Sequence, residues 1–397
     1  MLIAHKIALD PTNQQRTYFA RGAGVARFAY IWGLAEWQRQ FKAGETPSEV
    51  SLRRQLNAMK HEHYPWMFDV TKCAVQEALI DLGAAFRGFF EKRGNYPRFK
   101  KKGVHERFCA ANETGTFRTD GKRIKLPVIG WVRMREAVRF EGPLKRATIS
   151  READRWFVSV TVDAPDGVAP RPPQEVVGVD LGVLTLATPS RGEPITGPKA
   201  HTALLKNLRR TSRRLSRKQR GSQNRAKAKK SLRRLHVRIA NLRKDAMHKA
   251  TTKLAKTFQR IGIEDLNVGG MARNRYLARA IMDGGFFEFR RQLDYKARRY
   301  GAVVVVVDRW FASSKTCSCC GSLKAELDLS QRRFRCFECG FEADRDWNAA
   351  KNLEKLAASS AVSTCGEERS DAVRKPRVKR ASKKQEPNGI GDELCAA

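Results

Sequence analysis

The amino-terminal part of the chain changes from a strand-like to a helix-like pattern of hydrophobic residues. Residues 2–8 alternate apolar and polar side chains, which predicts a short strand, and Asp10 followed by Pro11 predicts the cap and first turn of a helix. Apolar and aromatic side chains then recur at helical spacing over three stretches, residues 19–41, 48–60 and 70–92. The pattern predicts a helical module of about 80 residues.

A period of two replaces the helical period between residues 117 and 163. One face of a predicted strand carries Trp156, Val158, Val160 and Val162. The dipeptide Asp120-Gly121 is typical of a hairpin turn. These signals predict a small β-barrel-like domain. Residues 163–174 contain four prolines and predict a linker to the rest of the chain.

Strand and helix patterns alternate after the linker. Strands are predicted at residues 176–180 and 183–188, and a third predicted strand ends at Glu264. The five valines of residues 303–307 predict a strand that is buried on both faces. Between the strands, helical patterns cover a long basic stretch, residues 204–258, and a shorter one, residues 286–300. Such alternation predicts an α/β sheet.

The chain is therefore predicted to be a multidomain α+β protein. Its predicted parts are a β domain at residues 1–14 and 104–170, a helical module at 15–103, an α/β domain at 174–310 and 344–358, a cysteine-rich insert at 311–343, and a tail at 359–397. The tail is rich in Ser, Lys, Glu and Pro and has little hydrophobic content, so we expect it to be disordered.

Charge indicates what kind of partner the protein has. The 397 residues include 78 Lys and Arg against 41 Asp and Glu, a formal net charge of +37. This excess excludes an ordinary metabolic enzyme and favours nucleic acid as the partner. The chain has no run of about 18 apolar residues and no apolar leader with a cleavage site, so we expect neither a membrane span nor a signal peptide, and a cytoplasmic protein.

Two segments are candidates for contacting phosphates. The first, residues 92–103, is basic and interleaved with Tyr96 and Phe99, whose rings could stack on bases. The second is a cationic rod, residues 209–243, interrupted near Gly221 and with few acidic residues to neutralise it. Solvated charge is the alternative for both. The candidate contacts are Arg98, Lys100, Lys101, Lys102, Arg213, Arg214, Arg217, Lys218, Arg220, Arg225, Lys229, Lys230, Arg233 and Arg234.

Three acidic residues lie where predicted strands end or a helix begins. Asp180 and Glu264 end strands, and Asp346 precedes a helix predicted to start near Asn348. Each alone could be a helix cap or a partner for Arg, and the neighbours Asp265 and Asp344 are alternative ligands. Three carboxylates around one sheet could instead hold two Mg²⁺ ions about 4 Å apart, which in a protein of this charge predicts a nuclease.

Five of the nine cysteines lie between residues 317 and 339. They include two C-x-x-C pairs, each followed by glycine, which predict a zinc ribbon whose ligands are Cys317, Cys320, Cys336 and Cys339. Four thiolates leave no open position for water, so this Zn²⁺ is expected to be structural. Cys319 is an additional thiol that could compete with Cys320.

In its motifs the chain resembles the TnpB family, the OrfB-type proteins of insertion sequences, which are related to type V CRISPR effector nucleases. The resemblance extends to about Leu356. It is carried by GVDLGV around Asp180, the basic stretch from Arg213 to Asp245, IEDLNVGGM, LARAIMDGGFFEFRRQLDYKA, and the pair SSKTCSCCG and DRDWNAAKN. Cys319, and Trp347 beside Asp346, depart from the family pattern.

The resemblance implies a transposon-encoded, RNA-guided DNA endonuclease that favours the persistence of its element by cutting sites that lack it. It implies a RuvC/RNase H-like nuclease domain with Asp180, Glu264 and Asp346 as catalytic residues, two Mg²⁺ ions and one structural Zn²⁺. The wedge-like β domain and the helical recognition module would hold the guide RNA and read a short motif beside a double-stranded DNA target in a prokaryotic cell.

A different function would fit the same basic composition. A catalytically silent accessory or regulatory factor of transposition would also bind nucleic acid through its Lys and Arg residues.

Overall fold

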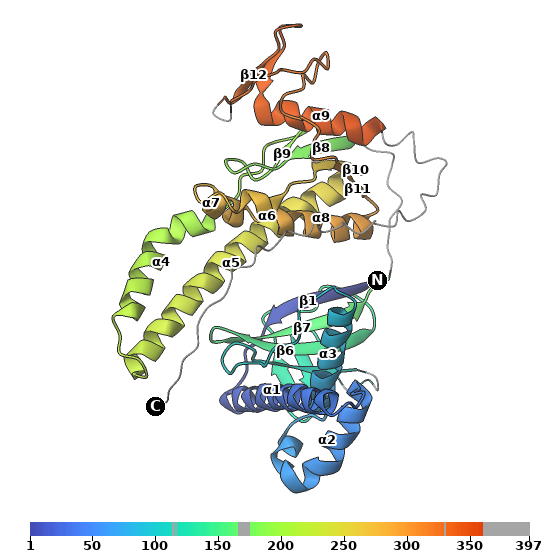
Figure 1. Cartoon of the computed structure of the whole chain (residues 1–397), viewed down its shortest axis with the longest axis vertical. Coiled ribbons are helices and arrows are strands. Elements are labelled where there is room, and N and C mark those ends of the chain that lie inside the picture. Colours follow the sequence, from blue (N-terminus) through green and yellow to red (C-terminus); the bar gives the residue numbers. More distant parts are fainter. Residues whose placement is uncertain (113–114, 116, 166–174, 329–330, 360–397) are drawn as a thin grey trace, which may run out of the picture.

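The computed structural model describes residues 1–112, 115, 117–165, 175–328 and 331–359. Almost all of the predicted tail and most of the predicted linker lie outside these residues. An amino-terminal lobe stands below a carboxyl-terminal lobe in the view of Figure 1. Each lobe has its own hydrophobic core, and a third small cluster surrounds Phe334. No helix in the described ranges is long and apolar enough to cross a membrane.

The amino-terminal lobe contains two antiparallel sheets. The larger sheet has the order β1-β7-β6-β2, with bounds Leu2–Ala8, Arg155–Asp163, Leu144–Glu152 and Arg107–Ala111. The smaller sheet has the order β3-β4-β5, with bounds Arg118–Asp120, Arg123–Leu126 and Gly130–Arg133. The first strand, the hairpin at Asp120-Gly121 and the alternation around Val158 are all confirmed.

Two helices, α1 and α3, pack on the larger sheet, α2 packs on these helices, and a short 3-10 helix, Pro65–Asp69, contacts α2. The α-helix bounds are α1 Asn13–Lys42, α2 Glu49–His63 and α3 Cys73–Phe90. The predicted start of the first helix is wrong by two residues. Thr12 is the cap, because its hydroxyl accepts the N–H of Gln15 and the Gln15 side chain accepts the N–H of Thr12.

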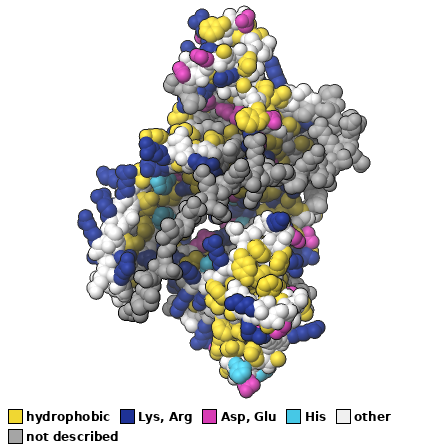
Figure 2. Space-filling view, viewed as in Figure 1, with side chains coloured by type: hydrophobic (Ala, Val, Ile, Leu, Met, Phe, Trp, Pro, Cys, Tyr) yellow, Lys and Arg dark blue, Asp and Glu magenta, His cyan; other side chains and the backbone are white. Residues whose placement is uncertain are grey.

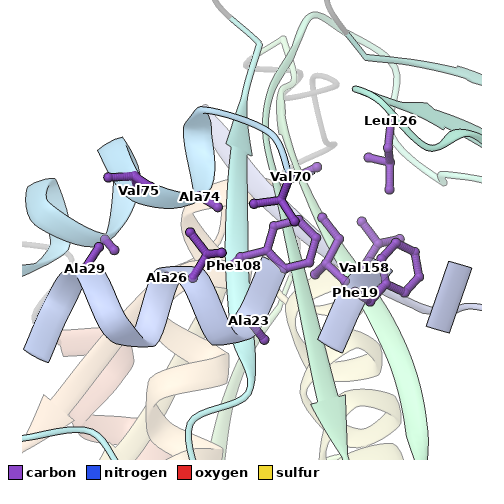
Figure 3. Packing of buried hydrophobic residues seen from close by; sticks show 14 of the residues in the cluster. Phe19, Ala23, Ala26, Ala29, Val70, Ala74, Val75, Phe108, Leu126 and Val158 are labelled. Carbon is purple, nitrogen blue, oxygen red and sulfur yellow. The ribbon is translucent and has the colours of Figure 1, made fainter. Parts of the chain in front are cut away.

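Helices and sheet of this lobe share one continuous core (Figure 3). Small residues along α1, including Ala23, Ala26 and Ala29, allow close contact with α3. The ring of Phe108 on β2 lies 6.2 Å from the ring of Phe19 on α1, centroid to centroid. The predicted helical module and β domain are thus joined by common packing.

The carboxyl-terminal lobe is built on a mixed sheet of order β11-β10-β8-β9. The strands are β8 Val176–Asp180, β9 Thr188–Pro189, β10 Arg260–Glu264 and β11 Val303–Val307. β8, β10 and β11 are parallel, and β9 is antiparallel to β8. The strand predicted at residues 183–188 is wrong, because the strand there is the two-residue β9, preceded by an isolated bridge between Ala187 and Ile195.

The valine strand does not have the predicted burial. β11 is an edge strand, and Val303 and Val306 are 50% and 39% exposed. The prediction of burial on both faces is therefore wrong: an unbroken apolar run fits a central strand, but here one edge has no neighbouring strand in the described part of the chain.

Helices enclose this sheet and extend away from it (Figure 1). α8 and part of α5 lie on one side and α9 on the other, while α4 and the rest of α5 form a projecting hairpin. The helices are α4 Ala200–Ser216, α5 Gln223–Thr257, α6 Val268–Met271, α7 Ala278–Gly284, α8 Phe286–Tyr300 and α9 Arg345–Ser359. A hairpin of β12 Arg333–Arg335 and β13 Glu342–Asp344 precedes α9.

Two glycines allow α9 to lie directly on the sheet. A Cβ atom on Gly178 of β8 would overlap the backbone carbonyl oxygen of Ala350, and one on Gly262 of β10 would collide with the backbone of Leu353. Helix and strands therefore touch backbone to backbone, and the start of α9 is held at the ends of β8 and β10.

Gly178→Ala tests this contact. The added methyl group meets backbone atoms that cannot rotate away, so we expect the variant to lose about 1 to 3 kcal/mol of stability and to melt at a lower temperature. Gly24→Ala is the matched control, because Gly24 lies in α1 with open space around it and alanine favours the helix. Equal melting temperatures for Gly178→Ala and the unmodified protein would show that α9 does not require this approach.

Candidate active site, metal centre and nucleic-acid interface

The three predicted catalytic acids come from three elements that meet at one edge of the sheet. Asp180 and Glu264 are the last residues of the parallel neighbours β8 and β10, whose register pairs Val179 with Ile263. Asp346 lies in the first turn of α9. The predicted helix start near Asn348 is therefore late by three residues, since α9 begins at Arg345.

These carboxylates affect one another electrostatically. The pKa of Asp180 is raised to about 8, first by burial and then by the negative charges of Glu264 and Asp346, with Arg345 acting in the opposite direction. Burial also raises the pKa of Glu264, although a hydrogen bond from the Ser313 hydroxyl to its Oε1 opposes the rise. The site thus concentrates acidic groups that are difficult to ionise together.

Basic side chains form close ion pairs with Asp346. The Asp346 carboxylate lies 3.4 Å from Arg345 Nε and 3.8 Å from Arg332 Nη1. The three carboxylates do not form a closed cluster. Within the described ranges, only the four cysteines bring three or more potential metal ligands within 4.8 Å of one another.

The two alternative acids have other partners. Asp265 forms ion pairs with Arg309 and, at 2.6 Å, with Arg290, and these arginines hold its pKa below the usual range. Asp344 Oδ1 accepts the backbone N–H groups of Asp346 and Trp347, at 2.9 and 3.0 Å, which makes Asp344 the N-terminal cap of α9.

Trp347 is partly buried beside the third acid. The Nζ atom of Lys351 lies 5.4 Å from the centre of its ring, one turn further along α9. Its ring therefore packs with its own helix.

Four cysteines form a compact sulfur cluster. The Sγ atoms of Cys317 and Cys339 are 3.7 Å apart, and those of Cys320 and Cys336 are 3.6 Å apart. Zn–S bonds of about 2.3 Å in a tetrahedron place sulfurs about 3.8 Å apart, so the cluster could hold a metal such as zinc. Cys319 is exposed and does not belong to the cluster, as the spacing had indicated.

Two asparagines that the sequence reading passed over join the cysteine insert to α9. The buried Asn348 side chain accepts the N–H of Ser318 at 2.9 Å and donates to the carbonyl of Thr316 at 2.8 Å. Asn352 donates to the carbonyls of Thr316 and Ser313, at 2.7 and 2.8 Å. Their spacing of four residues in DRDWNAAKN was the available signal, since it places two amides on one helical face.

The projecting hairpin carries a dense set of cations. In Figure 2, Lys and Arg side chains gather on the side of the molecule where α4 and α5 extend. Exposed candidates there include Arg213, Arg214, Arg217, Arg220 and Lys229, and Lys218 is partly buried. Arg98, Lys101 and Lys102 are exposed in the loop that follows α3. These eight exposed side chains are accessible to a polyanion.

Other candidate cations already contact the protein. Lys230 and Arg234 form ion pairs with Asp154 of the β6–β7 turn, and the Arg234 hydrogen bond lowers the pKa of Asp154 to about 2. Arg233 donates to the carbonyl of Gly103. These contacts join α5 to the amino-terminal lobe.

Two further predicted phosphate contacts, Arg225 and Lys100, interact with residues of their own lobe. Arg225 Nη1 donates to the carbonyls of Leu215 and Lys218, which fastens the turn between α4 and α5. Lys100 Nζ lies 3.5 Å from the centre of the Tyr30 ring, and burial lowers its pKa to about 8.

A buried acid that sequence reasoning missed secures the base of the hairpin. Asp283 of α7 accepts the first N–H groups of α4, from His201 at 3.1 Å and Thr202 at 3.3 Å. It also lies 3.0 Å from Arg243 Nε on α5. One carboxylate thus connects α4, α5 and α7.

Three protein-family models match the chain. One described as "Probable transposase" matches residues 157–275, and one described as "Cas12f1-like, TNB domain" matches residues 286–353. A third, a helix-turn-helix domain, matches residues 1–46, which here form β1 and the single 30-residue helix α1.

Similar proteins match nearly the whole chain. A Streptomyces pristinaespiralis protein named "Putative RNA-guided DNA endonuclease" is 36% identical over 97% of this chain and 96% of its own length. An Escherichia coli K12 protein of the same description, InsQ, is 35% identical over 92% of this chain and 94% of its own. A solved Cas12f1–sgRNA–target DNA complex shares the fold, with a TM-score of 0.56 and 15% identity over 86% of this chain and 83% of that one. The chain therefore belongs to the TnpB (OrfB) family, which is related to Cas12f.

Proposed function

We propose that this protein is a transposon-encoded, RNA-guided DNA endonuclease that hydrolyses phosphodiester bonds with the help of Mg²⁺. The observation that carries the proposal is the meeting of Asp180, Glu264 and Asp346 at one sheet edge of a chain with a net charge of +37. The names of its full-length relatives support the same activity.

The sheet topology supports a RuvC/RNase H-like assignment for the carboxyl-terminal lobe. Ligands of parallel sheets bind beyond the carboxyl ends of the strands, and both strand-borne acids lie at that edge. The third acid reaches the same edge because α9 crosses the sheet on Gly178 and Gly262.

The donor set fits Mg²⁺, which prefers carboxylate oxygens. Asp180, Glu264 and Asp346 would hold the ions; when bound, a pair of such ions activates water and stabilises the leaving oxygen. The raised pKa of Asp180 agrees with this assignment, because crowded carboxylates ionise fully only beside added positive charge. Ser313 orients Glu264, and the Asp344 cap fixes the backbone that carries Asp346.

Zn²⁺ in the cysteine cluster would be structural. Cys317, Cys320, Cys336 and Cys339 supply all four positions of a tetrahedron, so none remains for water or substrate. Through Asn348 and Asn352 the insert contacts the helix that bears Asp346, so the folded ribbon would hold that helix in place.

Guide RNA and double-stranded DNA are the proposed partners. The exposed arginines of α4 and the exposed basic residues after α3 would contact phosphates, while base pairing would supply the sequence specificity. The amino-terminal lobe would hold the RNA and read the flanking motif, as the resemblance implies.

The direct test is cleavage by the full chain purified with the RNA from its own genomic flank. A plasmid library should carry a guide-matched target beside randomised bases. We expect double-strand cutting beside one enriched motif with Mg²⁺, none with EDTA, and none with Asp180→Ala, which should still bind RNA. Bound RNA and matched DNA without any cutting would contradict the proposal and favour the accessory factor.

The electrostatic crowding can be measured through stability. The Asp180 carboxyl has an ordinary pKa of 3.8 when unfolded and about 8 when folded, so the metal-free protein loses stability as the pH rises through this interval. Asp180→Asn removes that penalty. We expect its melting temperature to exceed that of the unmodified protein by a margin that grows from pH 5 to pH 8.

Asp265→Asn is the matched control for that experiment. Arginines lower the pKa of Asp265, so its carboxylate stabilises the fold above pH 4 and the substitution should lower the melting temperature instead. A difference between Asp180→Asn and the unmodified protein that did not change with pH would contradict the assigned crowding.

The adjacent cysteines Cys319 and Cys320 provide a test of the zinc site. Cys320→Ser removes a ligand, so we expect less than one zinc per chain by elemental analysis and a lower melting temperature. Cys319→Ser, its exposed neighbour, should keep one zinc and an unchanged melting temperature. The reverse result would assign Cys319 as the ligand.

A further inference from the structure

A highly exposed tryptophan lies in the turn that follows β11. Trp310 is the third residue after β11 and is 86% exposed. The strands β8, β10 and β11 are parallel, so the segment after β11 leaves the sheet at the edge where Asp180 and Glu264 lie. An indole exposed to this degree presents its ring face to any planar partner that reaches this edge.

The turn that carries Trp310 is fastened on both sides to residues of the acidic edge. On one side, the Arg309 guanidinium pairs with Asp265, the residue after Glu264. On the other, the Ser313 hydroxyl donates to Glu264 itself. Trp310 therefore lies between two residues that contact the end of β10.

The backbone of this turn is also ordered internally. The Trp310 N–H donates to Asp308 Oδ1 at 2.7 Å, and the Phe311 N–H donates to the carbonyl of Asp308 at 3.1 Å. The backbone that carries the ring is consequently ordered before binding. Little conformational entropy would therefore be lost when a planar partner stacks on the ring.

The residue before the ring supplies a cation that a phosphate can reach. Arg309 pairs with Asp265 yet keeps 44% of its side chain exposed, while Asp308 accepts the Trp310 N–H and Arg290 also pairs with Asp265. A phosphate could approach the arginine while the attached base stacks on the indole. Proteins that bind single strands without sequence preference combine these two interactions. Bases within a duplex are already stacked on their neighbours, so the partner must be unpaired.

We propose that Trp310 is a positioning residue that stacks on an unpaired base of the DNA strand being cut and so places a neighbouring phosphate at the carboxylates. The inference rests on the proposed function, because pairing of a guide with one DNA strand is what leaves the other strand unpaired. It assigns to this exposed ring a specific ligand, a single nucleobase next to the cleaved bond.

Fluorescence can detect the stacked base without any cutting. The full chain with its RNA, made inactive by Asp180→Asn, is bound to matched DNA in which 2-aminopurine replaces one base of the unpaired strand at a time. We expect quenching at one or two positions, restored emission at those positions with Trp310→Ala, and retained quenching with Trp310→Phe. Quenching that is identical in the presence and absence of Trp310 would overturn the proposal.

Cutting rates then separate stacking from a general effect on the site. With active protein and subsaturating DNA, Trp310→Ala should reduce the rate about 5- to 150-fold on the normal strand. An abasic nucleotide at the quenched position should reduce the cutting rate of the unmodified protein by the same factor as Trp310→Ala does. It should not reduce the cutting rate of Trp310→Ala any further. Equal losses from Trp310→Ala on normal and abasic strands would contradict stacking.

Two controls complete the test. Phe41→Ala removes another ring, 68% exposed, at the far end of α1 and should change neither the quenching nor the rate. Trp310→Ala should melt at the same temperature as the unmodified protein, since the ring is exposed. If the unmodified complex binds DNA and shows quenching that depends on Trp310 but does not cut, the proposed function and the positioning of a cleaved bond both fail, and only the stacking of Trp310 on an unpaired base stands.

Discussion

The backbone contact between α9 and the β8–β10 pair is the constraint on which the candidate site depends. Gly178 and Gly262 leave no side chain between helix and sheet, so the first turn of α9 reaches the strand ends. Asp344 caps that turn, and Asn348 and Asn352 bind the cysteine insert to the same helix. A displacement of α9 would therefore move Asp346 and the base of the insert together.

The close packing of α9 on the sheet also brings negatively charged side chains near one another. Asp180 lies at the strand end near two other acids, and its pKa is raised to about 8, first by burial and then by the charges of Glu264 and Asp346. The nearby arginines are divided between two acids: Arg290 and Arg309 pair with Asp265, and Arg332 and Arg345 pair with Asp346. The fold thus holds carboxylates that repel one another at one edge of the sheet. This arrangement is expected of a site that binds cations.

Local patterns in the sequence predicted most elements, and contacts between distant residues explain the errors. The helix of residues 286–300 and the strand ending at Glu264 are as predicted, because periodicity within a segment determines them. The exposure of Val303 depends on whether another strand covers the edge, which no local pattern encodes. Arg213 and Arg234 look alike in the sequence, yet Arg234 pairs with Asp154, 80 residues earlier along the chain.

The candidate site was more predictable than the nucleic-acid surface. Cysteine spacing and the glycine that follows each pair distinguished Cys320 from Cys319, since ligands of one metal must converge. The three acids were selected by their positions at strand ends and by family motifs, and the structure brings them to one edge. Asp283 escaped notice because its partners, the N–H groups of α4, leave no signature in side-chain patterns.

The central claim, that the acidic edge binds divalent cations, is tested most directly by counting ions. Mn²⁺ binding followed by electron paramagnetic resonance, with Mn²⁺ standing in for Mg²⁺, can compare the unmodified protein with Glu264→Gln and Asp346→Asn. The account predicts saturable binding that both substitutions weaken by at least about tenfold, corresponding to about 1.4 kcal/mol. Equal Mn²⁺ affinity in all three proteins would contradict it.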